Sequence, residues 1–445
     1  MRASNLNEMA VRHYIAAACL AAFFIISCQS IKAQGRVDPN TLTGKMIMGY
    51  QGWFSCMDDA AGLSWWHWAI PGREPMMEMT DMLPDMTEFP AAERCPTHMK
   101  TADGRTVALF SSYNPATVER HFAWMQTYGL DGVALQRFAT ELLRAPFLKA
   151  RDVILGNVRR AAEDHGRVFF VMYDLSGLPA ADLSAVARDW ERLEQEGVTR
   201  SSAYLHHRGH PLLGLWGLGF PDRPLTSDNA IGLLDALERA SAPYGGVTFL
   251  GGVASHWRVQ DHEAAADPGW DRVWRRLGVI SPWSVGRFPD EKGADAFRHT
   301  VLEPDLIATR ALGVDYMPVV FPGFSWANLM RNRHFPEKAI RNEIPRRCGR
   351  FYWHQVYNAL TAGASMIYGA MFDEVNEGTA MFKLLPNAQD EPVQGIPGGT
   401  TFVTLDADGC RLPSDWYLRL AGATTAALRS RVRPSPNLPL PIPSE

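Results

Sequence analysis

The stretch Val168-Phe169-Phe170-Val171-Met172-Tyr173 consists of apolar and aromatic residues, without a charged side chain. A strand with one solvent-facing side alternates polar and apolar residues, whereas a strand covered on both faces of a parallel sheet is a continuous apolar run. We therefore expect a buried parallel strand here. Similar runs rich in Val, Ile, Leu, Phe and Tyr recur along the chain, and with this one they give candidate strands at 46–50, 130–136, 167–173, 211–216, 246–251, 278–284, 315–320 and 365–372.

Amphipathic stretches separate these runs and are long enough to be the crossover helices of parallel strands. Strands that alternate with helices in this way predict an α/β fold, a (β/α)8 TIM barrel in a single domain. The 445 residues, 46% of them apolar, are ample for a core of that size. The expected helices lie at 115–128, 149–165, 180–196, 228–242, 262–277, 295–312 and 351–363.

The barrel is expected to occupy residues 45–430. Within it, residues 51–114 form a long βα loop rich in Met, Pro, Trp and Gly, and loops of such length are usually functional or disordered. The aromatic content of this loop argues against disorder. The tail 431–445 is rich in proline, cannot form a helix and is expected to be a solvated extension.

Residues 1–27 have the layout of a secretory signal peptide, because basic residues precede an almost wholly apolar segment that is too short to span a bilayer comfortably. The segment ends in Ile25-Ile26-Ser27-Cys28, which resembles a bacterial lipobox, where cleavage before Cys28 leaves a lipid-modified residue. The linker would then span 28–44. Ordinary secretion with cleavage after Ala33 is the alternative. Both interpretations predict an exported bacterial protein, in the periplasm or at the outer membrane or cell surface. The lipobox interpretation adds a lipid anchor as the contact with the membrane.

The charge balance of 44 basic and 48 acidic residues includes no basic run long enough to grip a phosphate backbone, so nucleic acid is not an expected partner. Of six cysteines, one lies in the signal segment and Cys28 is the lipidation candidate. The remaining four would face an oxidising compartment, and a disulfide between Cys56 and Cys95 is one candidate pairing. Their spacing gives no support to a metal site.

The last candidate strand leads into an acidic segment, Asp373-Glu374-Val375-Asn376-Glu377-Gly378-Thr379. Active sites of TIM barrels lie at the carboxyl ends of the strands. Glycosidases use one protonated and one ionised carboxyl group, which two nearby acids in unlike environments can supply. A solvated acidic loop or a helix cap is the alternative interpretation. The residues alone leave both interpretations open, and Glu374 and Glu377 are the candidate catalytic residues of the first.

The stretch Phe372-Asp373-Glu374-Val375-Asn376-Glu377-Gly378-Thr379 resembles the Phe-Asn-Glu-Trp-His-Glu-Gly-Thr motif of glycoside hydrolase family 99, which contains endo-acting α-mannosidases and α-mannanases. The segments Gly49-Tyr50-Gln51-Gly52-Trp53-Phe54 and Trp65-Trp66-His67-Trp68 look like the start of the wider family 71/99-like group of exported bacterial proteins. The resemblance extends loosely from about Lys45 to Leu420.

The resemblance implies roles for both glutamates. Glu374 would act as a base on the sugar 2-hydroxyl and Glu377 as general acid and base, with retention through a 1,2-anhydro sugar. Asp373, Val375 and Asn376 depart from the Asn, Trp and His of the motif. The departures leave open both the substrate and a more ordinary acid/base partnership with Asp174.

Aromatic and polar residues near the ends of the other strands are the candidate substrate-binding residues. Aromatic rings pack on the apolar faces of sugar rings, and polar groups bind hydroxyls. A single Trp at a barrel rim is more often part of the packing, and Asp174 could instead cap a helix. The candidates are Tyr50, Trp53, Trp66, His67, Tyr173, Asp174, Trp216, His256, Trp257, Trp283 and Trp326.

The sequence thus predicts an exported glycoside hydrolase that cleaves O-glycosidic bonds of a polysaccharide or glycan, without a cofactor or metal. Retention and action on α-mannan are the expectations that the resemblance adds. One alternative is a family 71-like α-glucanase acting by direct displacement. Another is a non-catalytic carbohydrate-binding lipoprotein.

Overall fold

The computed structural model describes residues 35–70, 78–223, 225–430 and 432–443. Its main sheet has parallel neighbours in the order β10-β9-β8-β7-β5-β4-β1-β12-β11, and the short β6 (His206–His207) pairs antiparallel with β7. The parallel strands are β1 (Met46–Tyr50), β4 (Gly132–Phe138), β5 (Val168–Asp174), β7 (His210–Leu218), β8 (Thr248–Val253), β9 (Val279–Pro282), β10 (Asp315–Tyr316), β11 (Val319–Val320) and β12 (Ile367–Gly369).

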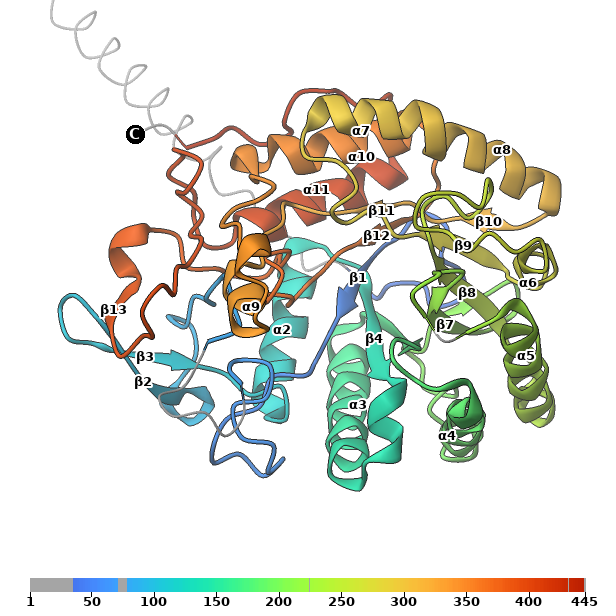
Figure 1. Cartoon of the computed structure of the whole chain (residues 1–445), viewed down its shortest axis with the longest axis horizontal. Coiled ribbons are helices and arrows are strands. Elements are labelled where there is room, and N and C mark those ends of the chain that lie inside the picture. The colour runs from blue at the N-terminus through green and yellow to red at the C-terminus, as the bar shows by residue number, and fades with distance from the viewer. Residues whose placement is uncertain (1–34, 71–77, 224, 431, 444–445) are drawn as a thin grey trace, which may run out of the picture. The chain divides into compact units, whose positions relative to one another are not determined.

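The sheet closes through one run of the chain, residues 315–320. Within this run β10 pairs with β9, at one end of the strand order, and β11 pairs with β12, at the other end. Every predicted strand segment contributes to the closed sheet. The fold is therefore the predicted (β/α)8 barrel, with its helices around the strands (Figure 1).

Helices follow the strands and bury their apolar sides against the barrel. They are α2 (Pro115–Tyr128), α3 (Ala145–His165), α4 (Ser184–Gln195), α5 (Ser227–Ser241), α6 (Trp270–Trp274), α7 (Glu291–Phe297), α8 (Glu303–Leu312), α10 (Arg350–Ala362) and α11 (Trp416–Arg429). A short helix, α9 (Ala327–Asn332), lies in the loop between β11 and α10.

The bounds of α2 agree with the sequence prediction because its end signals are local. The side chain of Asn114 accepts a hydrogen bond from the Ala116 N–H, Pro115 occupies the first turn, and Gly129 ends the helix with a φ of 78°. These signals are readable from the sequence alone.

Two expected helices differ from the prediction. The helix expected at 262–277 is confined to α6, which starts directly after Pro268 and Gly269. The helix expected at 295–312 is interrupted by a π-helical turn, η5 (Arg298–Leu302), between α7 and α8. Pro304, in the first turn of α8, has no N–H to continue the α-helical bonding pattern.

The long loop after β1 contains structure that the sequence pattern did not indicate. Its strands β2 (Cys95–Thr101) and β3 (Thr106–Leu109) form a small antiparallel sheet with β13 (Pro392–Gln394), at one side of the barrel in Figure 1. The described part of the chain contains two disulfides, the candidate pairing Cys56–Cys95 and a second between Cys348 and Cys410.

Residues 432–443 form no helix or strand and are mostly exposed, but some of their apolar side chains also contact the barrel. Leu438, Leu440 and Ile442 pack against the main hydrophobic core, and the indole N–H of Trp353 donates to the Ser435 carbonyl at 3.0 Å. Prolines alternate with these apolar residues, so an extended tail presents its apolar side chains to the core without a helix.

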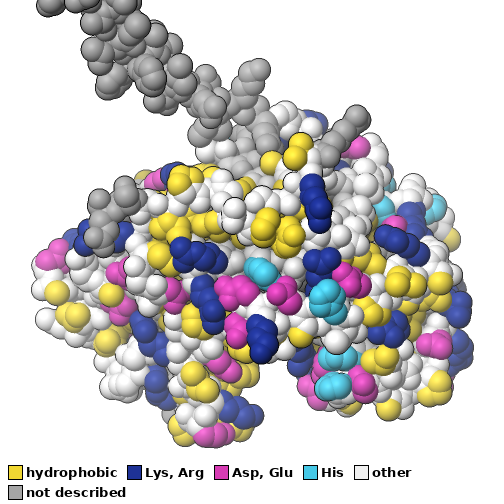
Figure 2. Space-filling model, turned by 90° about the horizontal axis from the view of Figure 1, so that it is seen from above, with side chains coloured by type: hydrophobic (Ala, Val, Ile, Leu, Met, Phe, Trp, Pro, Cys, Tyr) yellow, Lys and Arg dark blue, Asp and Glu magenta, His cyan; other side chains and the backbone are white. Residues whose placement is uncertain are grey.

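The predicted signal segment 1–27, Cys28 and the first part of the linker lie outside the described residues. Among the residues that are described, no helix is both long and apolar enough to cross a membrane. Figure 2 shows acidic, basic and histidine side chains mixed on one face of the molecule rather than gathered by sign.

Candidate active site

The carboxyl ends of β1, β5, β7, β9 and β12 surround a cavity of about 170 Å³, which we call the inner cavity. Its wall contains the acids Asp174, Glu374 and Glu377, the amides of Gln51 and Gln136, and the rings of Trp53, Trp216 and Trp283. A larger outer cavity of about 500 Å³ shares Trp216, Trp283 and Glu377 with it and adds Phe324, Trp326 and Arg223. Glu377 therefore lies where the two cavities meet.

Glu374 is held in place by three hydrogen-bond donors. Its Oε1 accepts from the backbone N–H groups of Asn376 at 2.8 Å and Glu377 at 3.2 Å, and its Oε2 accepts from Gln51 Nε2 at 2.9 Å. The side chain is 2% exposed. Its conformation is thus fixed before any substrate arrives, as a catalytic group requires.

Glu377 differs from Glu374 in its surroundings. Its backbone N–H donates to Glu374 Oε1, and its backbone carbonyl accepts a hydrogen bond from the Ser325 N–H at 2.9 Å. Among the described residues, no donor forms a hydrogen bond with its carboxyl group. The backbone of Glu377 is anchored while its carboxyl group remains available to a ligand in either cavity.

Asp373 joins the ends of the neighbouring strands β1 and β12. Its two carboxylate oxygens accept from the backbone N–H groups of Gln51 at 2.7 Å and Gly52 at 2.9 Å. An asparagine offers one acceptor oxygen and could satisfy only one of these donors. Asp373, which stands where the motif has Asn, therefore holds the backbone of Gln51 and Gly52 with both oxygens and so helps to place the Gln51 side chain beside Glu374.

Burial raises the pKa of all three acids of this segment. It raises the pKa of Asp373 to about 6, while the bonds from Gly52 and Gln51 act in the opposite direction. Burial and then the nearby Glu377 raise the pKa of Glu374 well above its usual range, and burial also raises the pKa of Glu377. Two close carboxyl groups disfavour double ionisation, so the pair can retain a proton near neutral pH.

Five of the predicted substrate-binding residues line the cavities. Trp53, Asp174, Trp216 and Trp283 line the inner cavity, and Trp326 lines the outer one. The rings of Trp216 and Trp283 meet edge to face, with centroids 5.5 Å apart. Together they offer apolar walls beside the acids, the combination expected of a sugar site.

Three predicted binding residues lie in the interior instead. The hydroxyl of Tyr50 contacts His121 Nδ1 at 2.9 Å, and that of Tyr173 donates to Asp189 at 2.6 Å. The indole N–H of Trp257 donates to Asp305 at 2.8 Å. All three side chains are almost wholly buried, so their assignment to the substrate site is corrected to a packing role.

Three further predicted residues stand behind or beside the cavities. His67 stacks on Trp53 with ring centroids 3.5 Å apart, and its carbonyl accepts from Asn376 Nδ2 at 2.7 Å. Trp66 packs edge to face on Phe147. His256 pairs with Glu263, whose side chain lines the outer cavity. His67 therefore supports a cavity wall, and we assign neither Trp66 nor His256 to sugar contact.

His256, Asp261 and His262 bring three potential metal ligands together on the loop after β8. The two imidazole rings are stacked, with centroids 4.4 Å apart and planes at 21°. Ring nitrogens bind a metal through lone pairs in the ring plane, and nearly parallel planes cannot converge on one ion. The arrangement does not suit a shared metal.

Sequence reasoning missed the amides of Gln51 and Gln136. Gln136 Nε2 donates to the Tyr368 hydroxyl at 3.1 Å across the barrel. The Oε1 of Gln51 is buried beside the inner cavity and has no hydrogen-bond partner among the residues that the structure describes. Gln136 is a polar residue inside an apolar run, and that contrast was the signal in the sequence. Gln51 directly follows β1, and residues at the carboxyl ends of barrel strands face the site.

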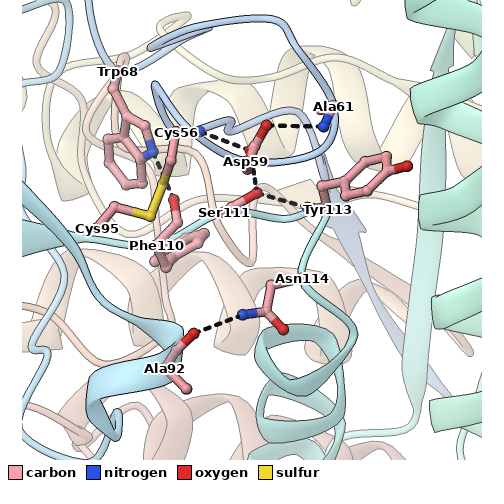
Figure 3. The surroundings of a disulfide bond; sticks show 10 residues. All are labelled: Cys56, Asp59, Ala61, Trp68, Ala92, Cys95, Phe110, Ser111, Tyr113 and Asn114. Carbon is pink, nitrogen blue, oxygen red and sulfur yellow. Dashed lines mark hydrogen bonds between the residues drawn. A yellow bond between two sulfur atoms is a disulfide. The ribbon is translucent and has the colours of Figure 1, made fainter.

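A larger cavity, of about 1250 Å³, lies elsewhere, between the loop after β1 and helices α2 and α3. Figure 3 shows the Cys56–Cys95 disulfide in its wall. Asp59 there accepts from the N–H groups of Cys56 and Ala61 and from the Ser111 hydroxyl, which explains its position structurally. The described part of this wall also contains Asp58 and Glu93, and Glu93 is paired with Arg120. We place the candidate chemistry in the smaller cavities because Glu374 and Glu377 lie together there.

Comparisons with known proteins bear on the fold. No protein-family model matches the sequence, and no curated protein matches it. Two solved structures of a GH99 endo-alpha-mannosidase from Bacteroides thetaiotaomicron, one in complex with BIS-TRIS-Propane, are similar to this chain with TM-scores of 0.59 and 0.60. Each is 14% identical, and each alignment covers 87% of this chain and 98% of the other. The chain therefore has a GH99-like (β/α)8 fold, in agreement with the resemblance of its motif.

Proposed function

We propose that this protein is a glycoside hydrolase that cleaves O-glycosidic bonds of a polysaccharide or glycan, with Glu374 and Glu377 as its catalytic carboxyl groups. The observation that carries the proposal is the placement of both glutamates in one aromatic-walled cavity at the carboxyl ends of the barrel strands. Their raised pKa values support acid/base work, because a general acid must hold a proton near the working pH.

The different surroundings of Glu374 and Glu377 favour different roles, Glu374 as the base and Glu377 as the acid. The donors around Glu374 stabilise its ionised form once the shared proton resides on Glu377. Glu374 then acts as the base toward a sugar hydroxyl, and the freely facing Glu377 protonates the departing oxygen. The attack of the deprotonated hydroxyl on the anomeric carbon displaces the leaving oxygen and forms an anhydro sugar. Glu377, now ionised, then deprotonates the attacking water, and Glu374 returns its proton to the hydroxyl oxygen as the anhydro ring opens. The result is net retention, as the family 99 motif implies.

The α-mannan direction of the activity is the finer part of the proposal. It rests on the motif at 372–379 and on the GH99-like fold. A family 71-like direct displacement is the second candidate, because Asp174 lines the same cavity as Glu377 and raises its pKa. Loss of all activity in Asp174→Asn, with inversion of the anomeric configuration in the product released by the wild type, would favour direct displacement, because water then attacks in a single step without a covalent intermediate.

We also propose export, with Cys28 as lipid anchor. The disulfides Cys56–Cys95 and Cys348–Cys410 support export, because disulfides persist in oxidising compartments. The lipid anchor rests on the lipobox-like sequence that ends at Cys28. The test is metabolic labelling with a radioactive fatty acid in a bacterial host. Label on the wild type and none on Cys28→Ser is the expected result; equal label, or label on neither, would contradict lipidation at Cys28.

The test of the function is a screen of α-mannan, α-glucan and host glycans with the wild type and with Glu377→Gln. We expect one glycan class to release products only with the wild type. Equal product from both proteins would remove Glu377 from its role. Binding of a glycan to the wild type without hydrolysis would instead favour a carbohydrate-binding lipoprotein.

A further inference from the structure

The loop after β1 runs directly beside the catalytic segment. The backbone N–H groups of Asp81 and Met82 both donate to the carbonyl of Val375, at 2.9 and 3.2 Å. Val375 lies between Glu374 and Glu377 and is fully buried. Asp81 and Met82, almost three hundred residues away in the sequence, therefore hold the centre of the segment 373–378, which we call the catalytic segment because it contains Glu374 and Glu377.

The carboxylate of Asp81 holds a second element at the same place. Its Oδ2 accepts from the Ser325 hydroxyl at 2.5 Å and from the Ala327 N–H at 2.7 Å, and its Oδ1 accepts from the Asn328 N–H at 2.7 Å. The side chain has no exposed surface. Asp81 thus anchors the start of α9 and the loop that leads to it.

Ser325 completes the connection to the catalytic segment. Its backbone N–H donates to the Glu377 carbonyl at 2.9 Å. Its backbone also packs closely on Gly378, where an added Cβ would come within 2.9 Å of the Ser325 nitrogen. Movement of Ser325 would therefore be transmitted to the backbone of Glu377.

We propose that Asp81 is a positioning residue that sets the Glu377 carboxyl group relative to Glu374, through Val375 on one side and Ser325 on the other. The role rests on the proposed function, although the contacts stand without it. Asp81 touches neither cavity, so it acts through these two neighbours and not on a ligand.

The charge and both oxygens of Asp81 are needed for this role. Asparagine has the same shape but only one acceptor oxygen, whereas the Ala327 and Asn328 N–H groups approach different oxygens. In Asp81→Asn the amide N–H group would face one of these N–H donors, so that one hydrogen bond is lost. We expect this loss to release the start of α9 and the loop that contains Ser325. The Asp81 backbone bonds to Val375 are unaffected by this change.

Asp131→Asn is the matched control. Asp131 is also fully buried and accepts a backbone hydrogen bond, from Met46 at 3.0 Å, together with an ion pair to Arg429. It precedes β4, at the opposite end of the barrel from the site. A loss of activity through general destabilisation should appear in both variants.

The experiment compares wild type, Asp81→Asn and Asp131→Asn by crystal structures and by kinetics on the glycan that the wild type hydrolyses. We expect the segment 375–378 to shift or lose order only in Asp81→Asn, with kcat reduced by about a hundredfold and KM within about threefold. A misplacement of about 1 Å at a catalytic group is enough for such a loss. Asp131→Asn should keep the wild-type site geometry and kcat.

An unchanged segment 375–378 in Asp81→Asn, or equal kcat values for the two variants, would overturn the positioning role. If the wild type hydrolyses no glycan, the proposed function fails, but the crystal structures still decide whether Asp81 holds this segment. The two proposals therefore fail by different observations.

Discussion

Gln51 Nε2 donates a hydrogen bond of 2.9 Å to Glu374 Oε2, which connects the end of β1 with the segment after β12. The other amide atom, Gln51 Oε1, is buried beside the inner cavity, and no described residue forms a hydrogen bond with it. Gln51 can therefore orient the proposed base and accept a hydrogen bond from a sugar hydroxyl at the same time.

Gln51→Met should reduce kcat/KM by about ten- to a hundredfold, because methionine has a similar length but removes both hydrogen bonds. A donor to a carboxylate stabilises the charged form, so its loss should raise the pKa of Glu374 further and move the acidic limb of the pH profile to higher pH. Gln355→Met, which removes a buried amide bonded to the Phe321 backbone away from the inner cavity, is the control. A Gln51→Met profile that overlays the wild type would exclude the orienting role.

Glu374→Gln should stabilise the protein at pH 8. The folded-state pKa values of Glu374 and Glu377 are both raised, so the folded protein retains on this pair a proton that the unfolded chain loses, and stability falls as pH rises from the unfolded towards the folded pKa values. Glutamine does not titrate, and its amide can donate to Gln51 Oε1 if the Gln51 amide turns over. Thermal unfolding should therefore show a Tm gain of about 2 °C or more at pH 8 and a smaller gain at pH 4.

The exposed Glu337 supplies the control for this effect, and Glu337→Gln should leave Tm unchanged within about 1 °C at both pH values. A Tm of Glu374→Gln below that of the wild type at pH 8 would show that Glu374 is a net stabilising group, contrary to its buried position beside Glu377.

Trp283→Ala should raise KM by about tenfold, equivalent to about 1.4 kcal/mol of binding free energy, because the ring walls both cavities. Trp257→Ala removes an indole of the same size that is bonded to Asp305 and contacts neither cavity. It should lower Tm without changing KM. A KM effect confined to Trp257→Ala would reverse the assignment of these two residues.

The Cys56–Cys95 disulfide closes a loop of the chain that contains Asp81, with a sequence separation of 39 residues. Loop-closure entropy predicts that replacing both cysteines by alanine costs about 4 kcal/mol, as does the same change at Cys348 and Cys410. The two double variants should therefore lose similar stability by denaturant unfolding. At temperatures below the melting range, only the Cys56/Cys95 double variant should also have a reduced kcat, because the loop that this disulfide closes contains the N–H groups that hold the Val375 carbonyl. Equal kcat values for the two double variants would argue against this role of the loop.

The barrel was predictable because each strand carries its own local signal. The run from Val168 to Tyr173 predicts a buried strand without information about distant residues. The acidic residues 373–377 directly follow the last candidate strand, 365–372. The family 99 motif added roles for Glu374 and Glu377 that spacing alone could not assign.

Side-chain direction was not predictable from these runs. In β5, Met172 contacts Gln136 within the barrel and Asp174 reaches the inner cavity, whereas Tyr173 between them points to Asp189 on α4. Successive strand residues face opposite sides, but a continuous apolar run gives no sign of which side is which. Asp81 was missed for another reason, since its partners are distant in sequence and no local pattern connects them.

The most direct test of the central claim is the release of new reducing ends from the glycan that the wild type cleaves, measured for wild type, Glu374→Gln, Glu377→Gln and Glu194→Gln. Glu194 is a buried glutamate on α4, bonded to Thr199 and outside both cavities. The account predicts losses of at least about a thousandfold for the first two variants and near wild-type activity for Glu194→Gln. Activity of Glu374→Gln and Glu377→Gln close to that of the wild type would contradict it.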